Sequence, residues 1–173
     1  MKKHLFLTSF IFFLLPLFSF SQAIQWQNTI GGNGFEWLRS IIQTNDGGYL
    51  LGGQSGSGIS GDKTENHYGG GDYWIVKTDS LGSIQWQNTI GGSDNDWIFK
   101  VIQTSDGGYL IGGWSESNIS GDKNENSNGL QDYWIVKTDS VGNILWQNTF
   151  GGNNTDELRS IVQTSDGGYL LGG

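Results

Sequence analysis

The sequence contains no cysteine, one proline and two histidines. The lack of cysteine excludes disulfides, thiol catalysis and a lipid-modified N-terminus, so stability must come from packing or from bound metal. No segment shows an apolar helical period with capping residues, which argues against helices. Basic residues are also scarce, since Lys and Arg number 9 against 17 Asp and Glu, for a formal net charge of −8. Because an acidic surface repels phosphate backbones, nucleic acid is not an expected partner.

Residues 1–21 have the pattern of a secretory signal peptide. Two lysines and a histidine follow Met1, Leu5–Phe20 is almost wholly apolar, and small residues surround the predicted cleavage site after Ser21. Cleavage after Ala23 is the alternative. An uncleaved membrane anchor is less compatible with the sequence, because the run is short for a spanning helix of about 20 residues. We expect a mature domain over 22–173, secreted or at the cell surface, with no membrane span after cleavage.

The mature sequence is an internal repeat with a period of 60 residues. The string IQWQNTIGG begins at Ile24 and recurs unchanged from Ile84, and a close variant begins at Ile144. A fixed period of this size indicates stacked structural units, each unable to bury its apolar face alone. The repeats cover residues 24–83, 84–143 and, in part, 144–173.

Each unit is predicted to form four antiparallel strands. In the first unit these are 37–44, 49–53, 73–78 and 84–90, which combine β-branched and aromatic residues with alternating polar ones. The Asp46-Gly47-Gly48 string between the first two is a tight hairpin turn, since glycine supplies the positive φ that such turns need. The fold class is therefore all-β, and the Gly/aromatic signature with four short strands per unit is typical of a β-propeller blade.

The segment Tyr73–Gly92, with its string YWIVKTDSLG followed by Trp86 and two glycines, resembles the tryptophan-docking repeat of quinoprotein-like propellers. The whole unit is similar to the long Gly/Trp repeats of secreted bacterial propellers, often cargo of type IX secretion. The resemblance spans Gln25–Gly173 and implies propeller blades in an extracellular or surface protein. A propeller ring needs at least about four blades. Two and a half units are therefore expected to form an open arc, as the N-terminal part of a longer repeat protein.

The sequence offers few parts for an enzyme. His67 is the only histidine after the signal peptide, and its counterpart in the next repeat is Ser127. Neither a G-x-S-x-G elbow nor a phosphate-binding loop occurs. We therefore expect a non-enzymatic scaffold or binding module. Its expected partners are further blades of the same chain or neighbouring copies, and an extracellular protein or glycan. The alternative function, a truncated piece of a quinoprotein-like enzyme, rests on fold analogy alone.

The recurring tryptophans are predicted to be structural. One set stands at the same place in each repeat and is expected to dock between adjacent blades: Trp26, Trp86 and Trp146. A sugar-stacking surface is the alternative for this set. Trp74 and Trp134 are expected in the core. Trp114 replaces Gln54 of the preceding repeat, so it is expected to be partly exposed and available to a ligand.

The connections of an antiparallel blade alternate between two rims. The tight turns should therefore share one rim, while the inter-unit link 31–35 and the long loop 55–71 share the other. Sequence differences between the two full units cluster in these longer connections, for example at His67 and Tyr68. Variable loops on one face of a repeat array are where ligands usually bind, although solvated loops also vary freely.

The second long loop carries oxygen-bearing side chains at alternate positions, a spacing that suits a hard cation such as Ca²⁺. These candidates are Asp122, Asn124, Asn126, Asn128 and Asp132. The pattern departs from an EF-hand loop, because glycine stands at the eighth position and no Glu closes the loop. Asp and Asn are also ordinary turn formers, so a solvated loop is the alternative. Calcium is the only cofactor that the sequence suggests.

Overall fold

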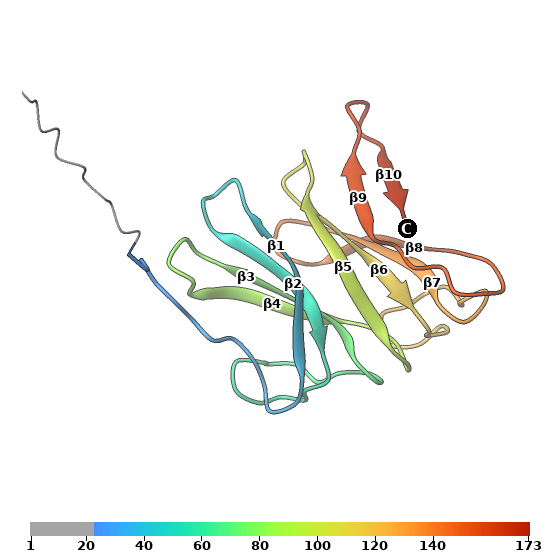
Figure 1. Ribbon diagram of the computed structural model, residues 1–173, viewed down its shortest axis with the longest axis horizontal. Coiled ribbons are helices and arrows are strands. Elements are labelled where there is room, and N and C mark those ends of the chain that lie inside the picture. Colours follow the sequence, from blue (N-terminus) through green and yellow to red (C-terminus); the bar gives the residue numbers. More distant parts are fainter. Residues whose placement is uncertain (1–22) are drawn as a thin grey trace, which may run out of the picture.

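The computed structural model describes residues 23–173 (Figure 1). The predicted signal peptide over 1–21 lies outside the described residues. The described part is all-β and contains no helix, hence none that could cross a membrane. Its strands are β1 (Glu36–Gln43), β2 (Tyr49–Ser55), β3 (Asp72–Thr78), β4 (Ile84–Ile90), β5 (Asp96–Gln103), β6 (Tyr109–Ser115), β7 (Asp132–Thr138), β8 (Ile144–Phe150), β9 (Ser160–Gln163) and β10 (Tyr169–Gly172).

The strands form two four-stranded antiparallel sheets and one small sheet. Sheet 1 has the order β1-β2-β3-β4, sheet 2 has the order β5-β6-β7-β8, and β9 and β10 form a separate hairpin, hairpin 3. The prediction of four strands per full unit is confirmed, with bounds that differ by one or two residues. The segment 24–30 matches β4 in sequence but forms no strand, because no described strand lies beside it for pairing.

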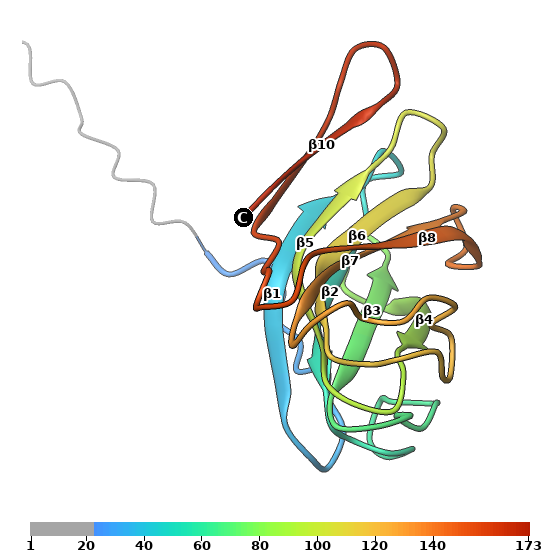
Figure 2. The ribbon, with the colours of Figure 1, turned by 90° about the vertical axis from the view of Figure 1, so that its right-hand side faces the viewer.

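Tight turns close the hairpins where the sequence places glycine. Gly47 and Gly82 have φ values of 83° and 82°, in the left-handed region that disfavours other residues. The Asp46 Oδ2 atom lies 2.8 Å from Lys77 Nζ, so the β1–β2 turn and the β3–β4 end of sheet 1 are joined. The tight turns therefore share one rim, as expected (Figure 2).

The opposite rim holds the inter-unit links and the long loops. The Asp62 N–H donates to the Gly31 carbonyl at 2.9 Å, and the Gly34 N–H donates to Ser57 Oγ at 2.7 Å. The next unit repeats the first contact, where the Asp122 N–H donates to the Gly91 carbonyl at 2.8 Å. These two links are thus each bonded to the long loop of the unit that they enter.

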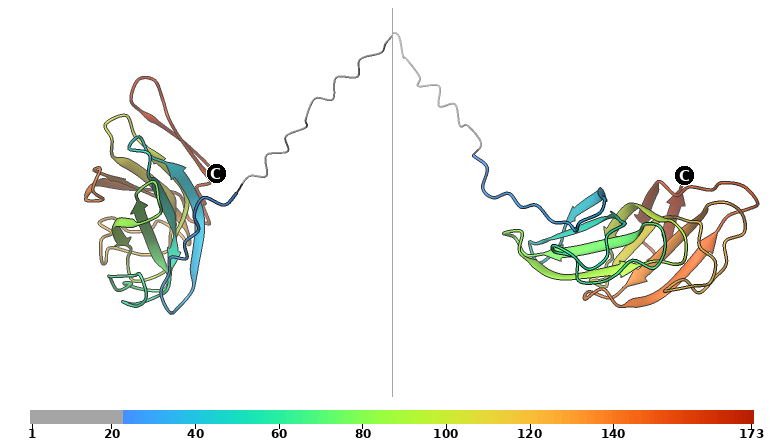
Figure 3. Two further views of the ribbon diagram at one scale, coloured as in Figure 1. Left: turned by 90° about the vertical axis from the view of Figure 1, so that its left-hand side faces the viewer. Right: turned by 90° about the horizontal axis from the view of Figure 1, so that it is seen from below.

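The sheets stack face to face in chain order, with the N-terminal segment at one end and hairpin 3 at the other (Figure 3). Between sheets 1 and 2, the Tyr73 hydroxyl donates to the Trp134 carbonyl at 3.0 Å. Small side chains permit this close approach, because a Cβ on Gly52 would stand 2.5 Å from Val101 Cγ1. The main core consists of Leu50, Tyr73, Ile75, Ile90, Ile98, Val101, Tyr109, Ile111, Trp134 and Val136. A second core joins sheet 2 to the C-terminal part of the chain through Leu110, Ile135, Leu158 and Ile161.

Candidate functional site

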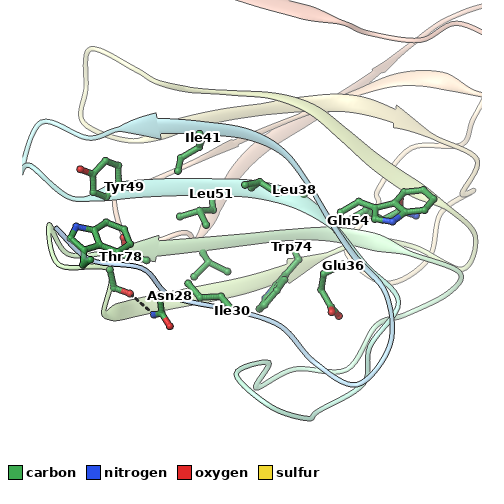
Figure 4. Close-up of a pocket in the computed structure, with 15 residues that line it drawn as sticks. Asn28, Ile30, Glu36, Leu38, Ile41, Tyr49, Leu51, Gln54, Trp74 and Thr78 are labelled. Atoms are coloured by element: carbon green, nitrogen blue, oxygen red, sulfur yellow. Dashed lines mark hydrogen bonds between the residues drawn. The ribbon is translucent and has the colours of Figure 1, made fainter. Parts of the chain in front are cut away.

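An apolar groove of about 350 Å³ runs along the face of sheet 1 that points away from sheet 2 (Figure 4). One wall is the segment 24–30, which crosses the sheet face without pairing to it. Two contacts hold that segment: the Trp26 ring lies 5.8 Å from the Tyr49 ring, and Asn28 Nδ2 donates to the Gly82 carbonyl at 3.0 Å. The N-terminal segment therefore turns a flat sheet face into a groove.

The groove is apolar at its base and at its open side. Trp74 and Val76 form part of the base and are buried, whereas Leu38 and Ile41 are 57% and 56% exposed. Glu36 is the only carboxylate among the lining residues, and it accepts a hydrogen bond from Ser55 Oγ at 3.1 Å. This surface can bury an apolar partner, since removing apolar area from water is favourable by roughly 25 cal/mol per Å².

The three repeat tryptophans make the same contact in each unit. Every one of them packs on the tyrosine that follows the next Asp-Gly-Gly turn. The ring centroid distances are 5.8 Å for Trp26–Tyr49, 5.9 Å for Trp86–Tyr109 and 6.0 Å for Trp146–Tyr169. Because Trp86 belongs to β4 and Tyr109 to β6, this ring lies between sheet 1 and sheet 2. Trp26 and Trp146 are more accessible, at 39% and 36% exposure.

Of the predictions for the other tryptophans, two are confirmed and one is wrong. Trp74 and Trp134 are buried, as expected for core residues, and a buried lysine ammonium lies over each ring. The expectation that Trp114 is available to a ligand is wrong, because only 5% of it is exposed. Its ring stacks on Trp97 at 5.1 Å. The replacement of Gln54 by tryptophan therefore enlarges an internal aromatic contact.

A second hollow, of about 380 Å³, is polar and lies at the loop rim where the two units meet. Its lining includes His67 and Tyr68 from the first long loop and Asp122 from the second. The Tyr68 hydroxyl donates to Asp122 Oδ1 at 3.5 Å, and Tyr68 is 53% exposed. Burial raises the pKa of the Asp122 carboxyl above its ordinary value. The hollow therefore presents an aromatic ring beside hydrogen-bonding groups.

The calcium-ligand candidates of the second long loop take part in separate hydrogen bonds. Asn126 Oδ1 accepts from the Ile119 N–H at 3.0 Å, and Asp132 Oδ2 accepts from the Asn128 N–H at 2.6 Å. The Asn124 N–H donates to Gln147 Oε1 at 3.2 Å. These are the bonds of turn-forming residues.

Within residues 23–173, no group of three or more His, Cys, Asp or Glu side chains could hold a metal ion. Asp122 and Asp132 therefore do not converge with a third carboxylate there.

Buried carboxylates at the unit boundaries are a feature that the sequence reading missed. Asp96 is fully buried, and it accepts from the Gly92 N–H at 2.7 Å and from Ser117 Oγ at 3.1 Å. Burial raises the pKa of Asp96 to about 7, and hydrogen bonds from serine and glycine partly oppose that rise. The signal was present in the sequence, because an acid stands four residues after the second glycine of each repeat: Glu36, Asp96 and Asp156.

The sequence matches no protein-family model and no curated protein. The geometry of the groove, of the rim hollow and of the repeated tryptophan contacts is therefore the basis for any function.

Proposed function

We propose that this chain is a secreted or cell-surface, non-enzymatic binding module built from β-propeller blades arranged in an open arc. Three observations support the blade interpretation. Each full unit is a four-stranded antiparallel meander, successive units stack face to face, and Trp86 packs on Tyr109 of the next unit. The apolar leader over 1–21 supports export.

The observation that carries the binding role is the polar hollow at the loop rim. It lies between two repeats, so it exists only because units stack. Its first-unit residues His67 and Tyr68 are replaced by Ser127 and Asn128 in the second unit, whereas the neighbouring strands β3 and β7 are identical in sequence. Variable loops on one rim of a repeat array are where ligands usually bind.

The chemistry of the hollow suits a glycan. The ring of Tyr68 offers an apolar face that a sugar ring can cover, with a hydroxyl at its tip. Asn66, Asn88 and Asp122 also line the hollow and supply amide and carboxylate groups that can pair with sugar hydroxyls. A neutral or cationic sugar fits the acidic chain better than a sulfated one, because the net charge of −8 repels anions.

Binding of a panel of neutral oligosaccharides to the purified protein, followed by titration calorimetry on the best binder, tests this proposal. Tyr68→Ala should weaken binding by about tenfold or more, which corresponds to about 1.4 kcal/mol. Asn128→Ala, at the equivalent place in the second loop, is the matched control and should leave the affinity unchanged. Equal losses from both variants, or no binding by any sugar, would count against a glycan site at this hollow.

Export is tested separately by mass spectrometry of protein recovered from an exporting host. The mature chain should begin at Gln22 or at Ile24. Recovery of soluble protein that retains Met1 would contradict a cleaved leader.

A further inference from the structure

The polar hollow at the loop rim has an acidic lining. Within residues 23–173, its lining includes the carboxylates Glu65 and Asp122 and the histidine His67, but no lysine or arginine. All of these lining residues belong to the first two units, so the hollow lies within the stack and not at one of its ends. A ligand that enters the hollow therefore meets two acids and no permanent positive charge.

The basic side chains of the protein lie elsewhere or are buried. In residues 23–173 one set is buried: Lys63, Lys77, Lys123 and Lys137. The other set lies on β1, on β5 and directly before β9: Arg39, Lys100 and Arg159. Lys63 contacts two lining residues, because its ammonium donates to the Glu65 carbonyl at 2.9 Å and to the Thr89 hydroxyl. Lys63 is only 1% exposed, however, so its charge is not offered to a ligand.

Asp122 makes only long hydrogen bonds at the hollow. Its Oδ2 accepts from the Gly91 N–H at 3.3 Å, and its Oδ1 accepts from the Tyr68 hydroxyl at 3.5 Å. A charged donor usually approaches a carboxylate to about 2.7–2.9 Å. A carboxylate has about four lone-pair sites, so both oxygens can accept a further, stronger hydrogen bond.

The electrostatic environment of the hollow favours a cation. Burial raises the pKa of the Asp122 carboxyl, hydrogen bonds from Gly91 and Tyr68 oppose that rise, and the charge of Glu65 adds to it. Burial also raises the pKa of the Tyr68 hydroxyl, and the negative charges of Asp122, Glu65 and Asp72 raise it further. An opposite charge beside a carboxylate stabilises its ionised form, so a bound cation would be stabilised by pairing with Asp122.

A molecular cation suits the hollow better than a metal ion does. Within residues 23–173 no group of three or more acidic, histidine or cysteine side chains could hold a metal, and Ca²⁺ takes six to eight oxygen ligands. A primary ammonium has three N–H donors and no acceptor. Three acceptors of the lining match it: the carboxylates of Glu65 and Asp122, and the Oδ1 atom of Asn88, whose Nδ2 already donates to the Gly142 carbonyl at 2.9 Å.

We propose, resting on the glycan-binding function above, that the sugar in this hollow carries an unsubstituted amine: Asp122 and Glu65 hold its ammonium group, and the Tyr68 ring covers the sugar ring. Tyr68 is positioned for this contact, because its ring lies against the second long loop, where a Cβ on Gly121 would stand 3.0 Å from Tyr68 Cδ1. An ammonium group close to the ring face also gains a cation–π contact.

Oligosaccharides that differ only at the amine test this assignment. Oligomers of glucosamine and of galactosamine are each compared with their N-acetylated forms and with the glucose or galactose oligomer of the same length. Titration calorimetry is carried out at mildly acidic pH, where the sugar amine is protonated. For at least one of the two sugars, the amine form should bind about tenfold more tightly than its two counterparts, a difference of about 1.4 kcal/mol.

Two isosteric variants separate the hollow from the overall charge of the protein. Asp122→Asn should weaken binding of the amine oligomer by about tenfold and leave binding of the hydroxyl oligomer within about twofold. Asp62→Asn is the matched control, because Asp62 accepts the equivalent bond from the Gly31 N–H at 3.1 Å but does not line the hollow. Both variants change the net charge equally, so a general attraction between a cationic sugar and an acidic protein would respond to both alike. Circular dichroism checks that each variant is folded.

The possible results distinguish this assignment from the glycan-binding function. If no oligomer binds, the glycan-binding function fails and the amine assignment fails with it. If the hydroxyl oligomer binds as tightly as the amine oligomer and Tyr68→Ala weakens both, the glycan-binding function is supported and the amine assignment is overturned. Equal losses from Asp122→Asn and Asp62→Asn also overturn the amine assignment, because affinity would then follow the net charge of the chain.

Discussion

Substitution of Gly52 by alanine should destabilise the protein by forcing sheets 1 and 2 apart. The added Cβ would stand 2.5 Å from Val101 Cγ1 and 3.5 Å from Ile98 Cγ2. Val101 is fully buried, and its β-branched side chain has little freedom to turn away. The methyl group therefore displaces either a core side chain or the backbone of a strand.

The size of the effect follows from two opposing contributions. Overpacking a close-packed core costs roughly 1–3 kcal/mol. Replacing glycine in a strand by alanine gains roughly 0.5–1 kcal/mol, because the unfolded chain loses freedom. Gly52→Ala should therefore lower the free energy of unfolding by about 1–2 kcal/mol. Gly172→Ala has only the favourable contribution, since nothing lies within 4 Å of its Cβ, and should be neutral or slightly stabilising.

Urea unfolding followed by tryptophan fluorescence measures both changes, with the slope of each transition checked for constancy. The double variant Gly52→Ala with Val101→Ala supplies a sharper test, because it removes the methyl groups that the new Cβ strikes. The double variant should lose less stability than the two single losses added together. Equal effects of Gly52→Ala and Gly172→Ala, or simple additivity in the double variant, would refute the claim that Gly52 sets the spacing between the sheets.

Three further predictions concern single side chains. Trp86→Ala should lower the free energy of unfolding by roughly 3 kcal/mol or more, and Trp26→Ala by clearly less, because only the Trp86 ring lies between two sheets. Equal decreases in the two variants, measured by urea unfolding, would contradict this. Burial raises the pKa of Asp96 to about 7, so the folded protein binds a proton that the unfolded chain releases. The free energy of unfolding should therefore decrease as the pH rises from about 4 to 7, with a slope approaching 1.4 kcal/mol per pH unit. Asp96→Asn should flatten this decline in pH-dependent unfolding, and an unchanged slope would exclude Asp96 as its source. Asn126→Ala should lower the melting temperature equally with and without calcium, and so should Asn66→Ala, because the Asn66 side chain makes the same hydrogen bond in the first loop. If only Asn126→Ala lowers the melting temperature in a calcium-dependent way, the result would instead support calcium binding by the second loop.

The candidate sites were only partly accessible to sequence reasoning. The equivalence of Trp26, Trp86 and Trp146 could be predicted from the sequence, because identical residues at a fixed period imply equivalent positions in the fold. The burial of Trp114 could not be predicted from the sequence, because its neighbour Trp97 lies on another strand and the two rings meet only when β5 pairs with β6. The rim hollow was foreseen only as a region of variable loops, since no single stretch contains both Tyr68 and Asp122.

The sequence by itself determined the all-β class, the length of the unit and most strand positions, because these depend on local preferences: glycine in the turns, β-branched and aromatic residues in the strands, and the 60-residue period. Only the tertiary structure decided which equivalent residues are buried. Leu38 and Ile98 occupy equivalent positions in two repeats, yet one is 57% exposed and the other 0%. The physical reason is that burial depends on what lies across the sheet face, and in a stacked array that neighbour is another unit.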